Sequence, residues 1–118
     1  AGLSSPWYFG AALPDHAAAW RQLINAGGFL APWGLTTTER RHACYNFSTW
    51  CPTSWNAPVW PFESAKVATA LIAALHDTEH RSALDLRAGV GPAQFHELLA
   101  TFARMHTRGR AREVAAGG

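Results

Sequence analysis

Long hydrophobic runs and concentrated charge are both missing from this chain. The longest apolar run, Val67 to Leu75, has nine residues, far fewer than the roughly 20 that an α-helix needs to cross a bilayer. The formal net charge of +2 is too small to indicate nucleic-acid binding. Four arginines gather near the end of the chain, but no aromatic residues that stack on bases are interleaved with them (Arg104, Arg108, Arg110 and Arg112). We therefore expect neither a membrane nor a nucleic acid as a partner.

Cysteine is scarce, and the usual metal motifs are absent. Cys44 and Cys51 are the only two cysteines, and they either form one bridge across a short loop or remain two small buried thiols. Their spacing is not CxxC, so a structural zinc site is not expected. His76 and His80 have i, i+4 spacing, but Asp77 follows His76 where an HExxH motif requires glutamate. We expect no metal and no cofactor, and the sequence leaves the compartment open.

Common catalytic motifs are also missing. No GxSxG motif occurs, and Gly89-Val90-Gly91 follows no strand, so neither a hydrolase nucleophile elbow nor a dinucleotide site is indicated. The sequence starts at Ala1, and the residues near it do not resemble a signal peptide with its basic and apolar regions. With 48% hydrophobic and 15% charged residues, the composition is that of a globular protein. We expect residues 1–118 to be part of one domain, incomplete at both ends.

Hydrophobic periodicity predicts three helices, and no strand alternation is longer than three or four residues. The first helix opens at Pro14-Asp15 and ends at Gly27-Gly28, with an apolar stripe at Trp20, Leu23 and Ile24. The second runs from Pro61 to about Asp77, and its apolar residues cover almost the whole circumference. A helix of this kind is buried on all sides.

The third helix begins after Gly91-Pro92 and is amphipathic, so it belongs to an outer layer. Residues 78–90 are predicted to be a loop that joins the inner helix to this outer one. Residues 29–60 form a second, much longer loop rich in Pro, Thr and aromatic residues. A loop of that length inside a compact domain is usually functional. The sequence therefore predicts an all-α fold with an inner helix, an outer helix and a long aromatic loop.

The segment Trp55-Asn56-Ala57-Pro58-Val59-Trp60-Pro61-Phe62-Glu63 carries the most specific chemistry. Two tryptophans and two prolines lie close together just before the second helix, and the prolines fix the backbone that presents the indole rings. A rigid aromatic surface suits a sugar ring, and Asn56 and Glu63 offer hydrogen bonds to its hydroxyl groups. The alternative is that these aromatic residues pack into a corner of the core.

Three blocks give the chain a family resemblance. They are Trp7-Tyr8-Phe9 with Trp20-Arg21-Gln22-Leu23, then Gly28-Phe29-Leu30-Ala31-Pro32-Trp33-Gly34-Leu35-Thr36-Thr37 running into Glu39-Arg40-Arg41, and then Trp55 to Phe62. Over roughly residues 7–106 the chain resembles the glycoside hydrolases that fold as an (α/α)6 barrel, or six-hairpin toroid. It is similar to the group that contains processing α-glucosidases, mannosylglycerate hydrolases and, more distantly, trehalases.

The resemblance implies hydrolysis of a glycosidic bond with inversion. One carboxylic acid protonates the leaving oxygen, and a carboxylate roughly 6.5–9.5 Å away activates water. By analogy both acids lie outside this segment, so no catalytic residue is expected here. Glu63 fits the helix dipole as a first-turn acid, Glu39 is expected to stay ionised beside Arg40 and Arg41, and Glu113 has no motif around it.

The resemblance transfers binding residues one by one. Trp55 and Trp60 match the aromatic pair that lines the sugar pocket, and Asn56 matches a polar position. Ala57 departs from the family pattern, in which glycine is usual. Arg40, with Glu39, matches a loop at the cleft rim, where a structural ion pair is the alternative reading. The predicted substrate-binding residues are Trp55, Asn56, Trp60, Glu63 and Arg40.

Two hypotheses follow from these residues. In the first, the chain is part of a glycoside hydrolase that binds an oligosaccharide or glycoside together with the remainder of its own barrel, and is inactive by itself. In the second, it is a non-catalytic helical module that binds carbohydrate or another partner. Because the second helix is so apolar, we expect the isolated chain to aggregate or to stay molten.

Overall fold

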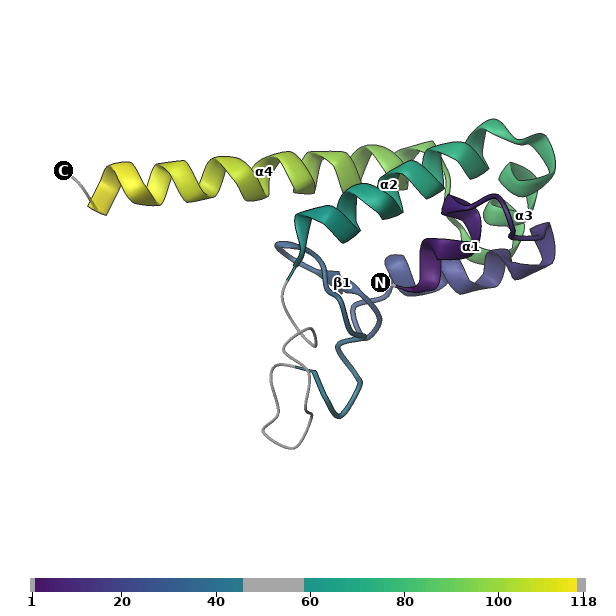
Figure 1. Ribbon diagram of the computed structural model, residues 1–118, viewed down its shortest axis with the longest axis horizontal. Helices are drawn as coiled ribbons and strands as arrows, with labels where there is room; N and C mark the ends of the chain where they lie inside the picture. Colours follow the sequence, from purple (N-terminus) through teal and green to yellow (C-terminus); the bar gives the residue numbers. More distant parts are fainter. Residues whose placement is uncertain (1, 46–58, 117–118) are drawn as a thin grey trace.

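The computed structural model describes residues 2–45 and 59–116, with side chains described as far as residue 106. The chain is mostly helical with one small sheet, which confirms the predicted all-α class and is compatible with part of an all-α toroid (Figure 1). The helical elements are η1 (Gly2–Ser4), α1 (Ser5–Tyr8), η2 (Pro14–Leu23), α2 (Pro61–His76), α3 (Thr78–Ala88) and α4 (Pro92–Ala116), and the strands are β1 (Leu30–Ala31) and β2 (Gly34–Leu35). Among the described residues, no helix combines the length and the hydropathy that a bilayer span requires.

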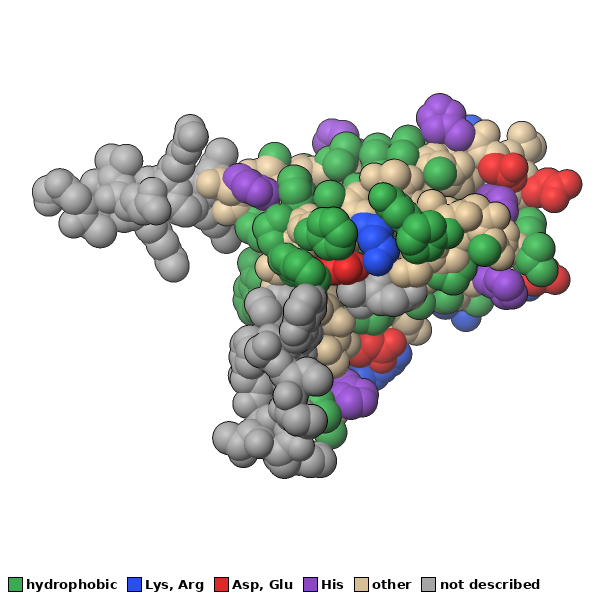
Figure 2. Space-filling view, viewed as in Figure 1, with side chains coloured by type: hydrophobic (Ala, Val, Ile, Leu, Met, Phe, Trp, Pro, Cys, Tyr) green, Lys and Arg blue, Asp and Glu red, His purple; other side chains and the backbone are tan. Residues whose placement is uncertain are grey.

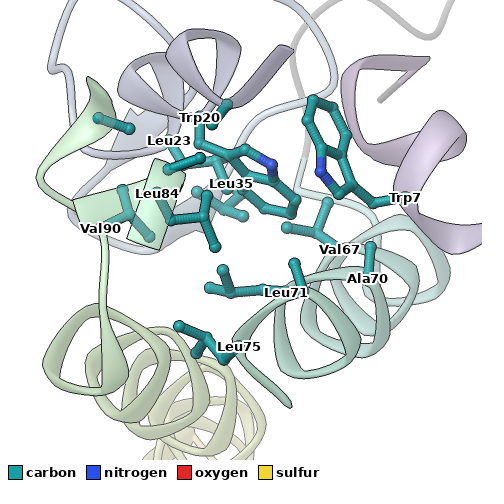
Figure 3. Packing of buried hydrophobic residues seen from close by; sticks show 14 residues of the cluster. Trp7, Trp20, Leu23, Leu35, Val67, Ala70, Leu71, Leu75, Leu84 and Val90 are labelled. Atoms are coloured by element: carbon teal, nitrogen blue, oxygen red, sulfur yellow. The ribbon is translucent and has the colours of Figure 1, made fainter. Parts of the chain in front are cut away.

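Helix α2 is the central element of the described fold. It begins with Pro61 at the first helical position, where the missing N–H is not needed, and it packs against η1, α1, α3 and α4. Figure 3 shows its aliphatic side chains meeting Trp7 and Trp20, whose ring centroids lie 5.1 Å apart in an edge-to-face arrangement. The buried residues of α2 all lie toward this core: Ser64, Val67, Ala70, Leu71, Ala74 and Leu75.

The opposite face of α2 is not covered by the described residues. Phe62, Ala65, Thr69 and Ala73 are exposed, so the described residues cover one side of this helix and not its whole circumference. The sequence pattern correctly identified an apolar helix, but periodicity alone does not say how many neighbours the same chain supplies. Apart from Phe62, the exposed side chains of this face are small, and most of them are apolar. A largely apolar helix face is typical of a surface that packs against another element.

Residues 78–90, predicted as a loop, are mostly helical. Helix α3 follows α2 after the single residue Asp77, whose side chain accepts a hydrogen bond from the backbone N–H of His80 at 2.9 Å. This is a helix N-cap. Gly89 ends the helix in the left-handed conformation, with φ of 64°, as glycine commonly does. The loop prediction was therefore wrong, and α3 packs against η2.

The first predicted helix is a 3-10 helix, which changes which residues are buried. Ala17, Trp20 and Leu23 are buried at spacings of three, and a 3-10 helix has three residues per turn, so these residues share one face. Ile24, which an α-helical stripe would have buried, lies beyond the end of η2 and is exposed. The predicted stripe was thus correct for Trp20 and Leu23 and wrong for Ile24.

The long predicted loop contains a short antiparallel hairpin. Leu30 pairs with Leu35, and Ala31 pairs with Gly34, a pairing too short to show as alternation in the sequence. Cys44, further along the same segment, is disulfide-bonded, while Cys51 lies outside the described residues. Helix α4 is amphipathic as predicted, because Phe95 and Leu98 pack against the core, and Figure 1 shows it extending well past the other elements.

Candidate functional site

Two aromatic side chains stand exposed where α2 begins. Trp60 is the N-cap residue, with extended backbone angles, and Phe62 lies in the first turn. The indole is 36% exposed and the phenyl ring 62% exposed. Their ring centroids lie 5.3 Å apart at an interplanar angle of 43°. This Trp60–Phe62 pair is a continuous apolar surface that faces outward.

The hairpin fixes where the Trp60–Phe62 pair lies. Thr36, just after β2, forms an isolated antiparallel bridge with Val59, just before Trp60. Gly34 makes this close approach possible, because a Cβ atom there would lie 3.0 Å from Val59 Cγ1. The buried Thr36 hydroxyl lies 2.7 Å from the carbonyl oxygen of Thr38 and 3.2 Å from that of Phe29. The loop is thereby held against the start of α2.

Glu63 lies directly beside the aromatic pair and forms an ion pair with Lys66. Its Oε2 is 3.4 Å from Lys66 Nζ, and the two side chains are only 15% and 19% exposed. That oxygen is buried and accepts no hydrogen bond within the described part of the chain. Glu63 also lines a small cavity of about 20 Å³ between α2 and the hairpin, together with Leu3, Leu23, Phe29, Leu35, Thr36, Ser64 and Val67. A charged pair is thus placed in mainly apolar surroundings.

Arg40 is turned toward the backbone of its own loop. Its Nη1 donates hydrogen bonds to the carbonyl oxygens of Leu30 at 3.1 Å and Ala26 at 3.3 Å. The neighbouring Arg41, and not Arg40, forms the ion pair with Glu39, at 2.8 Å from Nε to Oε2. Arg40 therefore links the residues before the hairpin to those after it, which shapes the loop beside α2.

The structure brings together some of the predicted site residues. Trp60 and Glu63 lie three residues apart at the start of α2. Arg40 donates hydrogen bonds to backbone carbonyls beside and within the hairpin that contacts this region. Trp55 and Asn56 lie outside the described residues. Sequence reasoning missed Phe62 and Lys66. Their i, i+4 spacing, which places them on one face of α2 next to Glu63, was the available indication.

The other acidic side chains near these elements have structural contacts. Asp15 of η2 pairs with Arg87 of α3 at 2.6 Å, and Glu97 pairs with Arg104 within α4 at 3.0 Å. Asp77 caps α3. Across residues 2–45 and 59–116 no group of three or more His, Cys, Asp or Glu side chains is arranged to hold a metal ion. The region around Trp60 is therefore an aromatic and polar binding surface, without a described pair of acids that face each other.

The described chain is mostly helical and exposes an aromatic pair at the start of an apolar helix. The chain belongs to the MGH1-like glycoside hydrolase family: the family model described as "Mannosylglycerate hydrolase MGH1-like glycoside hydrolase domain" matches residues 2–115. This confirms the family resemblance and supports a carbohydrate as substrate. No curated protein and no solved structure matches the chain.

Proposed function

We propose that this chain forms one wall of the sugar-binding cleft of an enzyme that hydrolyses α-linked gluco- or manno-configured O-glycosides. Trp60 supplies the apolar surface for a sugar ring, and Glu63 accepts a hydrogen bond from a hydroxyl group. Trp55 and Asn56 complete this wall in the proposal. Arg40 contributes by fixing the shape of the adjacent loop, through its hydrogen bonds to backbone carbonyls.

The observation that carries this proposal is the exposure of the Trp60–Phe62 pair. Large aromatic side chains are usually buried, and adjacent exposed rings mark a surface that binds something. A sugar ring has apolar C–H faces edged by hydroxyl groups, so its binding site needs a flat apolar surface with polar groups beside it. The pair provides the first, and Glu63 with Lys66 provides the second.

The chemical step in this proposal is inverting hydrolysis. An acid protonates the leaving oxygen while a base activates water on the opposite face, which requires two carboxyl groups roughly 6.5–9.5 Å apart. Glu63 in the first turn of α2 and Glu39 in the loop after the hairpin are each engaged in an ion pair. We therefore assign the acid and the base to other parts of the polypeptide, and we assign binding alone to this chain.

Kinetics of the complete gene product test this function. We expect it to hydrolyse α-linked gluco- or manno-disaccharides, and we expect proton NMR to show that the first product formed has the inverted anomeric configuration. Trp60→Ala is expected to raise KM roughly 10-fold or more, because truncating a central aromatic residue removes much of the binding energy.

Phe9→Ala is the matched control for this substitution. Phe9 is also an exposed aromatic residue, and it lies at the C-cap of α1. Gly10, which follows it, lines a cavity with Asp77 at the far end of α2. The Phe9→Ala variant should keep the wild-type kcat and KM. Unchanged turnover in Trp60→Ala would remove this residue from the cleft. Glycan binding without any turnover would favour a non-catalytic carbohydrate-binding module.

A further inference from the structure

Lys66 is the only lysine in the chain, and it is unusually well covered. It lies in the second turn of α2, with a side chain only 19% exposed. Lysine covers its aliphatic stem readily and keeps its ammonium group accessible. Nζ is not among the buried side-chain atoms that lack a hydrogen bond, so the ammonium of Lys66 is available to a ligand beside the covered stem.

The contact with Glu63 leaves hydrogen-bonding capacity in both groups. Nζ and Oε2 are 3.4 Å apart, which is an ion-pair contact, and Oε2 accepts no hydrogen bond from the described residues. An ammonium has three donors, and a carboxylate has about four acceptor positions. Buried polar groups normally have hydrogen-bond partners. The described residues leave some hydrogen-bonding positions of Glu63 and Lys66 without a partner, so a structural ion pair does not account for both groups fully.

The position of the ion pair extends the aromatic surface along α2. Phe62 and Lys66 are i, i+4 neighbours on one face of the helix, and Glu63 lies beside them at i, i+3 from Lys66. Figure 2 shows one basic and one acidic side chain close together at the surface, with hydrophobic side chains along part of their edge, over the region where Figure 1 places α2. A ligand that lies on the Trp60–Phe62 pair is therefore within about one helical turn of both charged residues.

We propose that Glu63 and Lys66 together bind two neighbouring hydroxyl groups of the sugar that lies on the Trp60–Phe62 pair. The carboxylate accepts a hydrogen bond from one hydroxyl through Oε1, since Oε2 is buried, and the ammonium donates a hydrogen bond to the next. The ring bound here is an uncharged sugar with adjacent hydroxyls, because the charge of Lys66 is already balanced by Glu63. Lys66 is thus a specificity-determining residue. This assignment rests on the proposed function.

Deoxy substrates test the assignment in the complete gene product. The substrates are para-nitrophenyl α-glucopyranoside and α-mannopyranoside, with monodeoxy analogues that each lack one ring hydroxyl. In the wild-type enzyme, loss of the hydroxyl bound by Lys66 should lower kcat/KM roughly 10-fold or more, because hydrogen bonds to charged groups are strong. In Lys66→Met the same deoxygenation should change kcat/KM less than twofold, whereas the other deoxygenations keep their wild-type effects.

Three further variants complete the design. Glu63→Gln should lose discrimination at the adjacent hydroxyl, and Lys66→Arg should keep part of the discrimination because it keeps the charge. Arg81→Met removes a positive charge from the exposed surface of α3. It should leave unchanged the kcat/KM of each deoxy substrate relative to that of its parent glycoside. If Lys66→Met fails to fold, Lys66→Gln repeats the measurement with a polar side chain of similar length.

The outcomes separate this assignment from the proposed function. Equal losses for Lys66→Met on every substrate, deoxy or not, would show a structural role and overturn the assignment alone, provided that Trp60→Ala still raises KM. A wild-type enzyme that hydrolyses neither glycoside, or a Trp60→Ala variant with normal kinetics, would overturn both. If Lys66→Met keeps the wild-type loss of kcat/KM for every deoxy substrate, Lys66 does not belong to the site.

Discussion

Single residues decide how the hairpin meets α2, and Gly34 is the clearest case. Its φ of 137° is one that residues with a side chain rarely adopt. A Cβ atom there would also lie 3.0 Å from Val59 Cγ1. Two independent constraints, one on the backbone and one on space, therefore require glycine at this position.

We expect Gly34→Ala to lower the free energy of unfolding of the complete gene product by about 2 kcal/mol or more, since backbone strain alone costs about 1–3 kcal/mol. Gly89→Ala is the control. Its φ of 64° is also positive, but a Cβ atom there would meet nothing within 4 Å, so the loss should be about 1–2 kcal/mol. Urea unfolding measures both values. Equal losses would mean that the contact with Val59 does not matter.

The sequence predicted Trp60 and Glu63 at the start of α2 because Pro61 marks the first turn of a helix clearly. The exposure of the indole had no such local indication, whereas the i, i+3 spacing of Glu63 and Lys66 did indicate the partner of the carboxylate. Lys66 was overlooked because a lysine on a helix is usually a solvated residue, and only the packing around it shows that it is covered. The ion pair of Glu39 was expected near two arginines, but sequence order does not say that Arg41, and not Arg40, would form it.

At the scale of whole elements, the largest error concerned α3. Its N-cap Asp77 and its C-terminal Gly89 are both standard helix boundaries, so its ends were visible in the sequence. The residues between these ends did not indicate a helix, because few of them are large and apolar and one of those, Leu86, is exposed. The hairpin was missed for a different reason, since strands of two residues are too short to show alternation.

We expect Asp77→Ala to lower the free energy of unfolding by about 1 kcal/mol, because the helix loses its side-chain N-cap. Asp77→Asn should retain most of the stability, since asparagine caps nearly as well. Asp85→Ala is the control on the same helix, as its exposed side chain lies near the C-terminal end, where an acid is not favoured. Hydrogen exchange of the first amides of α3 should rise in Asp77→Ala only. Unchanged protection there would mean that packing against η2 stabilises α3 without the cap.

At the scale of the whole molecule, the chain buries one side of its central helix and leaves much apolar surface uncovered. Large hydrophobic residues remain exposed in or next to α1, η2, α2, α3 and α4 and in the hairpin. They are Tyr8, Phe9, Leu13, Ile24, Leu30, Trp33, Trp60, Phe62, Leu86 and Leu99. A hollow of about 120 Å³ also opens between η2, the hairpin, α2 and α4, with mainly aliphatic side chains around it. The aromatic pair explains two of these exposed residues, and the others indicate surfaces that pack against something else.

We therefore expect the 118 residues, produced alone, to bind a hydrophobic dye such as ANS and to unfold over a broad temperature range, because an uncovered apolar surface loosens side-chain packing. The complete gene product is the control and should show weak dye binding and one cooperative transition. Near-ultraviolet circular dichroism gives a second measurement, since loosely packed tryptophans lose their fixed surroundings. A sharp melting transition for the isolated chain, with little dye bound, would show that these residues form a complete core by themselves. In that case the exposed face of α2 would be an ordinary surface, and Trp60 and Phe62 would be its distinctive feature.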